Sequence, residues 1–212
     1  MKNANSAQAH SFADPHRNIS ALGVEDGMKI ADFGAGSGAY ALIFAHAVGK
    51  SGRVYAVDVQ RDLLRRIHNE AHRKGLDNVD VIWGDLETPH GSKLANRSID
   101  IVLISNLLFQ MSDIHTVFDE AWRILKPTGR LAVIEWEERP PRAASSKIMA
   151  IGPHRDAIVH RAQAVSGVQA RGFKLAHEFA AGAHHYGLMF DIAPQEYSHL
   201  PKSKHEQEKL VA

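Results

Sequence analysis

Short apolar stretches alternate with amphipathic segments along residues 28–136. The apolar stretches are rich in Ile, Val, Leu and Ala, as buried strands are, and they occupy 28–33, 53–59, 79–85, 99–108 and 130–136. Helical spacing of the apolar residues between them predicts helices over 39–48, 61–75 and 114–126. Buried strands that alternate with amphipathic helices predict a parallel sheet covered on both faces.

The pattern changes after residue 138. We expect an irregular connection over 139–155, a helix over 156–172 and two strands within 173–192, around the sequence Ala-Ala-Gly-Ala at 180–183. A short glycine-containing connection predicts a hairpin, so the last strands are expected to run antiparallel. The predicted fold class is therefore α/β: a Rossmann-like, doubly wound, mostly parallel seven-stranded sheet with an antiparallel last strand.

The composition excludes several kinds of site. The 212 residues are 44% hydrophobic and 23% charged with a formal net charge of +1, so no nucleic-acid partner is expected. Cysteine is absent, which rules out disulfides, thiolate metal ligands and cysteine nucleophiles. The 14 histidines show no HExxH-type spacing, and no metal site is expected. No apolar run approaches ~20 residues and the first residues lack a signal-peptide pattern, so we expect no membrane span and a cytoplasmic location.

A glycine-rich loop at 34–38 follows the first predicted strand. Gly34, Gly36 and Gly38 occupy alternate positions, an arrangement that costs conformational entropy unless a ligand approaches the backbone closely. Residues 34–39 satisfy the dinucleotide fingerprint GxGxxA, and Asp58 follows about 20 residues further on, as that fingerprint requires. An NAD(P)-dependent oxidoreductase is therefore one interpretation of the loop.

Three carboxylates at strand ends favour a different ligand. Asp32 precedes the glycines, where a carboxylate would repel a pyrophosphate and attract a cation. S-adenosylmethionine carries an ammonium and a sulfonium group and no phosphate. Asp58 and Asp85, at the ends of the second and third strands, could accept hydrogen bonds from its ribose and its adenine amino group, or could instead cap helices.

Five segments, in this order, resemble the motifs of class I S-adenosylmethionine-dependent methyltransferases, of the small-molecule type related to ubiquinone and menaquinone methyltransferases (methyltransferase type 11-like). The segments are DFGAGSG (32–38), VYAVDV (54–59), GDLE (84–87), IDIVLISNLLFQMSD (99–113) and ILKPTGRLAVIEW (124–136). The resemblance covers roughly residues 12–192. The final hairpin also fits the family's sheet, in which the last strand is inserted in reverse.

The resemblance implies S-adenosyl-L-methionine as the cofactor and in-line methyl transfer to a small-molecule substrate as the reaction. It also implies the residues that bind the cofactor: Asp32, Gly34, Gly36, Gly38, Asp58, Val59, Gly84, Asp85, Leu86 and Asn106. Val59 also fits a core position, and Asn106 a helix cap. A non-catalytic module that binds S-adenosylmethionine is a further interpretation.

The acceptor side departs from the family pattern. Many relatives carry a histidine pair in the loop after the fourth strand, where this chain has Phe109 and Gln110. Gln110 could orient an acceptor, and Glu135 and His154 are candidates for a general base, although both also fit loop positions in water. A related group methylates arsenite held by thiolates, and a chain without cysteine cannot use that chemistry.

The chain is expected to divide into three parts. Residues 1–20 form an N-terminal segment that is either a disordered leader or a lid, since corresponding segments of relatives close over the cofactor; Phe12 would anchor it. Residues 21–200 form a single cofactor-binding domain, and 201–212 form a charged tail.

Overall fold

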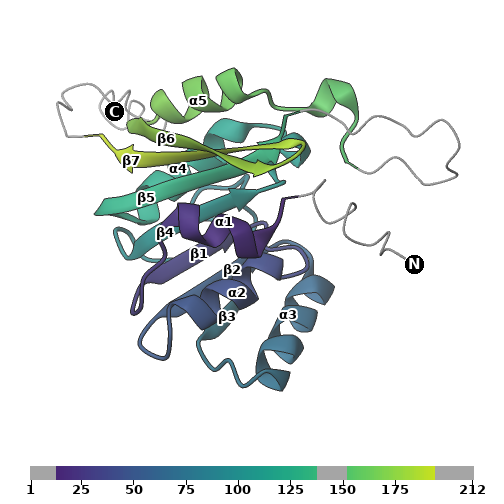
Figure 1. Ribbon diagram of the computed structural model, residues 1–212, viewed down its shortest axis with the longest axis vertical. Coiled ribbons are helices and arrows are strands. Elements are labelled where there is room, and N and C mark those ends of the chain that lie inside the picture. The colour runs from purple at the N-terminus through teal and green to yellow at the C-terminus, as the bar shows by residue number, and fades with distance from the viewer. Residues whose placement is uncertain (1–12, 138–151, 194–212) are drawn as a thin grey trace, which may run out of the picture.

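The computed structural model describes residues 13–137 and 152–193 (Figure 1). Strands and helices alternate along the chain before a final hairpin. In chain order they are α1 (Pro15–Leu22), β1 (Lys29–Phe33), α2 (Ala39–Ala47), β2 (Arg53–Asp58), α3 (Arg61–Arg73), β3 (Val79–Trp83), β4 (Ile99–Ser105), the 3-10 turn η1 (Leu108–Gln110), α4 (Ile114–Ile124), β5 (Leu125–Trp136), the 3-10 turn η2 (Arg155–Ala157), α5 (Arg161–Gln169), β6 (Phe173–Gly182) and β7 (His185–Ile192).

The seven strands form one sheet in the order β3-β2-β1-β4-β5-β7-β6. The first five are parallel to one another, and β7 runs antiparallel to both β5 and β6. The order reverses between β1 and β4, and in such open sheets ligands bind beyond the carboxyl ends of the strands at this point. The fold class predicted from the sequence is confirmed.

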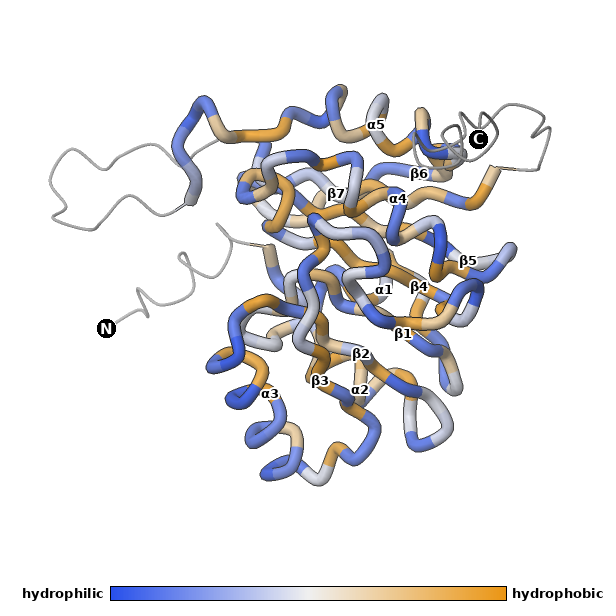
Figure 2. The backbone as a smooth tube through the Cα atoms, turned by 180° about the vertical axis from the view of Figure 1, so that it is seen from behind, coloured by the Kyte–Doolittle hydropathy of each residue, from blue (hydrophilic) through white to orange (hydrophobic). Residues whose placement is uncertain are grey.

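Each face of the sheet has its own apolar core. Ile30 of β1 belongs to the core that also holds Leu22, Phe44 and Ile67 of α1, α2 and α3, whereas its neighbour Ala31 belongs to the core beneath α4 and α5. Successive residues of a strand point to opposite faces, so the apolar run of each parallel strand fills both cores. Figure 2 shows this as hydrophobic colour gathered along the strands.

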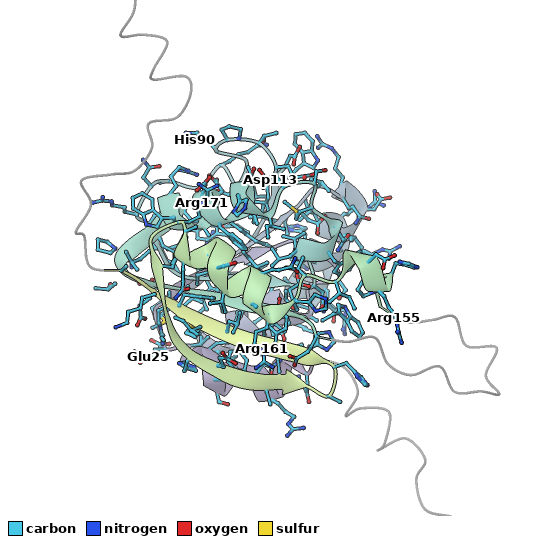
Figure 3. All side chains as sticks on the ribbon, turned by 90° about the horizontal axis from the view of Figure 1, so that it is seen from above. Glu25, His90, Asp113, Arg155, Arg161 and Arg171 are labelled. Atoms are coloured by element: carbon cyan, nitrogen blue, oxygen red, sulfur yellow. The ribbon has the colours of Figure 1, made fainter. Side chains whose placement is uncertain are left out.

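The helices on the second face are fixed at their first turns. Asp113 caps α4 by accepting the backbone N–H of His115 at 2.8 Å. Arg161, labelled in Figure 3, begins α5 and donates to Glu137 after β5 and to Glu178 of β6, each at 2.7 Å. These contacts hold α5 against the last hairpin.

Several predicted boundaries were wrong. The strand predicted to reach residue 108 ends at Ser105, because Asn106 adopts a left-handed backbone with φ of 53°. Residues 127–129, between the helix predicted over 114–126 and the strand predicted over 130–136, lie inside β5. The single helix predicted over 156–172 is replaced by η2 and the shorter α5. The hairpin turns at 183–184, because Gly182 still pairs with His185.

The N-terminal segment contains a helix that the pattern did not predict. Asp14 accepts the N–H of His16 at 3.0 Å and Pro15 begins α1, while Leu22 is fully buried. The expected division after residue 20 thus falls within α1, and Phe12 lies outside the described residues. Among the residues that the structure describes, none of the helices has the length and apolar character that crossing a bilayer needs.

Candidate functional site

A cavity of about 470 Å³ lies over the carboxyl ends of β1, β2, β3 and β4. Its walls come from the segments that follow these strands, together with Ala13 and Pro15 at the start of α1. This is the position where the reversal of strand order leaves room for a ligand. The segments that line it include 32–40, 58–60, 84–87 and 105–111.

The glycine loop between β1 and α2 forms one wall. Gly34 and Gly38 have φ of 69° and 80°, and an added Cβ would lie 2.8 Å from Leu107 Cδ1 and 2.7 Å from Ile67 Cγ1 respectively. Both positions therefore need glycine for backbone conformation and for packing. Gly36 differs, because a Cβ there would meet no atom of the described residues closer than 3.8 Å, so this part of the structure leaves the loop open at Gly36.

Asp58 connects the glycine loop to the end of β2. Its Oδ2 accepts the N–H of Gly36 at 2.9 Å and its Oδ1 accepts the N–H of Gln60 at 2.8 Å. The side chain lines the cavity although the residue is only 7% exposed. Each carboxylate oxygen can accept more than one hydrogen bond, so Asp58 keeps acceptor capacity for a ligand.

Asp32 lies at the end of β1 in the floor of the cavity. The residue is 2% exposed, and its Oδ2 is buried without a hydrogen-bond partner among the described residues. Burial is the main cause that raises the pKa of Asp32 to about 7. The nearby Asp58 acts in the same direction, and the hydrogen bond from the N–H of Ala41 acts in the opposite one. A buried carboxylate oxygen without a donor is costly, so a cationic donor from a ligand would stabilise the ionised form.

The cavity is acidic. Asp32, Asp58, Asp85 and Glu87 line it, and no Lys, Arg or His is present among its described lining residues. A phosphate group would meet uncompensated negative charge there, whereas a cation would be attracted.

Apolar side chains form the wall beside β2 and β3. Val59 is 53% exposed and lines the cavity with Leu86, so its alternative placement in the core does not hold. Gly84 lies close to Gly91, whose carbonyl oxygen would be 2.3 Å from an added Cβ. Asp85 accepts the N–H of Glu87 at 3.0 Å and leaves its carboxylate at the exposed edge of the cavity.

Comparisons with known proteins agree with this geometry. The family model described as a methyltransferase domain matches residues 24–159. This chain belongs to the class I methyltransferase family. An arsenite methyltransferase of Aquipseudomonas alcaligenes is 36% identical over 111 residues, which cover 50% of this chain and 32% of that protein. A ubiquinone/menaquinone biosynthesis C-methyltransferase of Haemophilus ducreyi is 30% identical over 121 residues, covering 57% and 46%.

A solved structure of a SAM-dependent methyltransferase from Aquifex aeolicus has the same fold, with a TM-score of 0.75 and 22% identity. The alignment covers 88% of this chain and 93% of that one. The chain spans about half or less of the length of the curated relatives named above.

In this methyltransferase domain, the turn after β4 forms the remaining wall. Asn106, Leu107, Gln110 and Met111 line the cavity. Gln110 Nε2 donates to the carbonyl oxygen of Asn106 at 2.8 Å, which fixes the amide at the cavity edge. The sequence placed Asn106 and Gln110 here, and both are present at this wall.

The two other acceptor-side candidates lie elsewhere. Glu135 is 1% exposed and does not line the cavity; its Oε1 accepts the N–H groups of Leu107 and Leu108, each at 2.6 Å. The side chain of His154 is 75% exposed and lies 3.1 Å from Asp156. The structure therefore brings Gln110 to the cavity, with Glu135 behind its wall and His154 in solvent.

Tyr40 and Ser105 are among the lining residues that the sequence interpretation did not identify. Tyr40 is buried, and its hydroxyl accepts a hydrogen bond from Asn18 Nδ2 at 2.9 Å; burial raises its pKa to about 12. Ser105 hydrogen-bonds the same hydroxyl. Their position in the cavity depends on contacts between α1, α2 and β4, which no local sequence motif predicts.

Proposed function

We propose that this chain binds S-adenosylmethionine in the acidic cavity and transfers its methyl group to a small-molecule acceptor by in-line displacement. The observation that carries the proposal is a set of four carboxylates with no cation among the described lining residues, together with a buried Asp32 oxygen that has no donor in the described part of the chain. A ligand with an ammonium and a sulfonium group supplies the charge that this site lacks.

The residues present fit each part of that ligand. Asp32 would receive the ammonium group, and Asp58 would accept hydrogen bonds from the ribose hydroxyls. Asp85 would accept the adenine amino group, while Val59 and Leu86 would contact the faces of the base. Gly34, Gly36 and the backbone at Gly84 would allow the close approach, and Asn106 would lie beside the methionine part.

When bound, S-adenosylmethionine supplies a methyl group activated by the sulfonium. The chain's contribution is to align an acceptor with that methyl group and to exclude water, and alignment alone can supply ~7–11 kcal/mol of a barrier. Gln110 is the residue best placed to orient the acceptor, since its Nε2 is engaged and its Oε1 can accept a hydrogen bond. A base is required only for an acceptor that must lose a proton.

The NAD(P)-dependent alternative is disfavoured by charge. Its pyrophosphate would lie at the glycine loop, beside Asp32 and Asp58 and without a cation among the described lining residues. The names of relatives suggest quinone-like acceptors or arsenite. The absence of cysteine disfavours arsenite bound through thiolates.

The experiment is an acceptor screen that measures S-adenosylhomocysteine by mass spectrometry. The protein is incubated with S-adenosylmethionine and a panel of phenols, quinols and amines. We expect acceptor-dependent product that falls at least roughly ten-fold in Asp58→Ala, because charged hydrogen bonds are lost. Asp62→Ala is the matched control, because Asp62 has a 78% exposed side chain on α3 and lies outside the cavity. Binding of the cofactor without turnover on any acceptor would instead support the non-catalytic module.

A further inference from the structure

The turn after β4 has a backbone conformation that needs support. Asn106 has φ of 53°, in the left-handed region that non-glycine residues other than Asn and Asp rarely adopt. It directly follows Ser105, the last residue of β4. This wall of the cavity therefore begins at a residue with a left-handed backbone conformation, which most residues avoid.

A buried carboxylate holds this turn from behind. Glu135 of β5 accepts two consecutive N–H groups, those of Leu107 and Leu108, with a single oxygen at 2.6 Å each. Leu108 begins η1 and is 1% exposed, so water is not available to replace Glu135 as the acceptor. Two consecutive N–H groups can reach one oxygen only when the backbone turns between them, so Glu135 stabilises the turned conformation of Leu107 and Leu108.

A buried imidazole holds the Asn106 side chain. His185 begins β7 and is 4% exposed; its Nε2 lies 3.1 Å from Asn106 Oδ1, and its ring lies against Trp136 with centroids 4.1 Å apart. Burial lowers the pKa of His185 to about 4, so the ring is neutral at pH 7 and its Nε2–H can donate to the amide oxygen. The final hairpin thus contributes a contact to the wall of the cavity.

The same turn contacts the glycine loop. The side chain of Leu107 lies against Gly34, where an added Cβ would be 2.8 Å from Leu107 Cδ1. Asn106, Leu107, Gln110 and Met111 all line the cavity. A shift of the turn would therefore move one wall directly and the glycine loop through Leu107.

We propose that Glu135 and His185 are positioning residues of the cofactor site: from behind the wall they hold Asn106 and Leu107 in the conformation that binds S-adenosylmethionine. Neither residue lines the cavity. This assignment rests on the proposed function, and it gives Glu135 a role other than that of a general base.

The test compares substitutions by calorimetric titration with S-adenosylhomocysteine. Glu135→Leu removes the acceptor of both N–H groups and should weaken binding at least ~10-fold. Glu135→Gln keeps a carbonyl oxygen and should remain within ~3-fold of the unaltered chain. Glu120→Leu is the matched control, because Glu120 is also a buried glutamate that accepts a backbone N–H, from Ser92 at 3.0 Å, and neither of these two residues lines the cavity. It should lower thermal stability and leave affinity unchanged.

Glu135→Gln separates positioning from general destabilisation. It keeps a carbonyl oxygen that can accept the N–H groups of Leu107 and Leu108, so affinity should follow the acceptor and not the charge of residue 135. If Glu135→Leu fails to fold, His185→Phe tests the positioning role instead. It keeps an aromatic ring against Trp136 but loses the contact with Asn106, and it should weaken binding ~3–10-fold.

The outcomes are distinct. Failure of the unaltered chain to bind S-adenosylhomocysteine contradicts the proposed function itself. The positioning role alone is overturned if the unaltered chain binds normally and Glu135→Leu binds with equal affinity. Where Glu135→Leu does not fold, equal affinity in His185→Phe overturns it. Equal weakening in Glu120→Leu would also overturn it, because the effect would then come from lost stability.

Discussion

The charge state of single carboxylates determines what this cavity can hold. Asp32 and Glu135 are both buried, and burial raises the pKa of each to about 7. They differ in their partners. Glu135 accepts two backbone N–H groups, whereas one oxygen of Asp32 has no donor among the described residues. Asp32 is therefore the carboxylate whose ionisation a ligand would change most.

Asp32→Asn should alter the pH dependence of stability. The folded chain keeps the Asp32 proton up to a pKa of about 7, whereas the unfolded chain releases it near 3.8. Between these values the folded state binds more protons, so Asp32 lowers the free energy of unfolding as pH rises. Asparagine does not titrate, so the variant should gain stability relative to the unaltered chain at about pH 8 and much less at about pH 4. Urea denaturation measures this; an equal difference at both pH values would contradict it.

Among single residues, those that belong to contiguous motifs could be predicted from the sequence as lining the site. Gly34, Gly36, Gly84 and the three aspartates at strand ends line one cavity, because parallel strands bring their carboxyl ends to one edge, whereas Gly38 lies outside the lining. Tyr40, Ser105 and the support given by His185 were not predictable, because each depends on a contact between residues distant in sequence. The sequence identified Glu135 by its place at the end of β5. Its burial was not predictable, because it results from the turn of residues 106–110 packing over it.

Among the elements, the glycine loop and α3 are fitted closely to each other. Gly38 is the residue before α2, with φ of 80°, and its Cα faces Ile67 of α3. Gly75, after α3, also has a left-handed φ, of 67°, but within the described ranges 13–137 and 152–193 an added Cβ would meet no atom within 4 Å. The two glycines share a backbone requirement and differ in packing.

Gly38→Ala should therefore destabilise the fold more than Gly75→Ala. The left-handed conformation alone costs roughly 1–2 kcal/mol for alanine. Gly38→Ala adds a contact at 2.7 Å with Ile67 Cγ1, and overpacking typically adds about 1–3 kcal/mol. Urea denaturation of both variants measures the difference in unfolding free energy. Equal losses would show that Ile67 moves away freely and that the fit is not close.

The existence of these elements was predictable, and several of their ends were not. Apolar runs and helical spacing are local properties, so the parallel strands and the helices between them follow from the sequence. Ends are set by contacts: β5 begins at Leu125 because Ile99 of β4 pairs with it, and β4 ends where Asn106 turns. Helix α1 was missed because its short polar sequence gives a weak apolar pattern.

Across the whole molecule, α1 connects the first described residues to the last hairpin. Asn18 is 3% exposed, and its Nδ2 donates to the Tyr40 hydroxyl at 2.9 Å and to the Ala181 carbonyl oxygen at 3.0 Å. One amide group thus joins α1, α2 and β6. This connection also reaches the cavity, since Tyr40 lines it.

Asn18→Ala should lower the stability of the whole domain. The substitution leaves buried acceptors on Tyr40 and Ala181 without their donor, which costs about 1–3 kcal/mol. Ser20→Ala is the control on the same helix, because Ser20 is exposed and its hydroxyl donates to the carbonyl oxygen of Arg17, one turn away on the same helix. Thermal denaturation should show a single transition at lower temperature for Asn18→Ala. An unchanged transition would mean that α1 does not contribute to the cooperative unit.

The acidic cavity is proposed to select a cationic nucleoside over an anionic dinucleotide. Calorimetric titration of the full chain with S-adenosylhomocysteine, which keeps the ammonium group, and in parallel with NADH tests this proposal most directly. We predict saturable binding of S-adenosylhomocysteine at one site per chain and no heat of binding with NADH. Saturable binding of NADH, or the absence of binding by S-adenosylhomocysteine, would contradict the account.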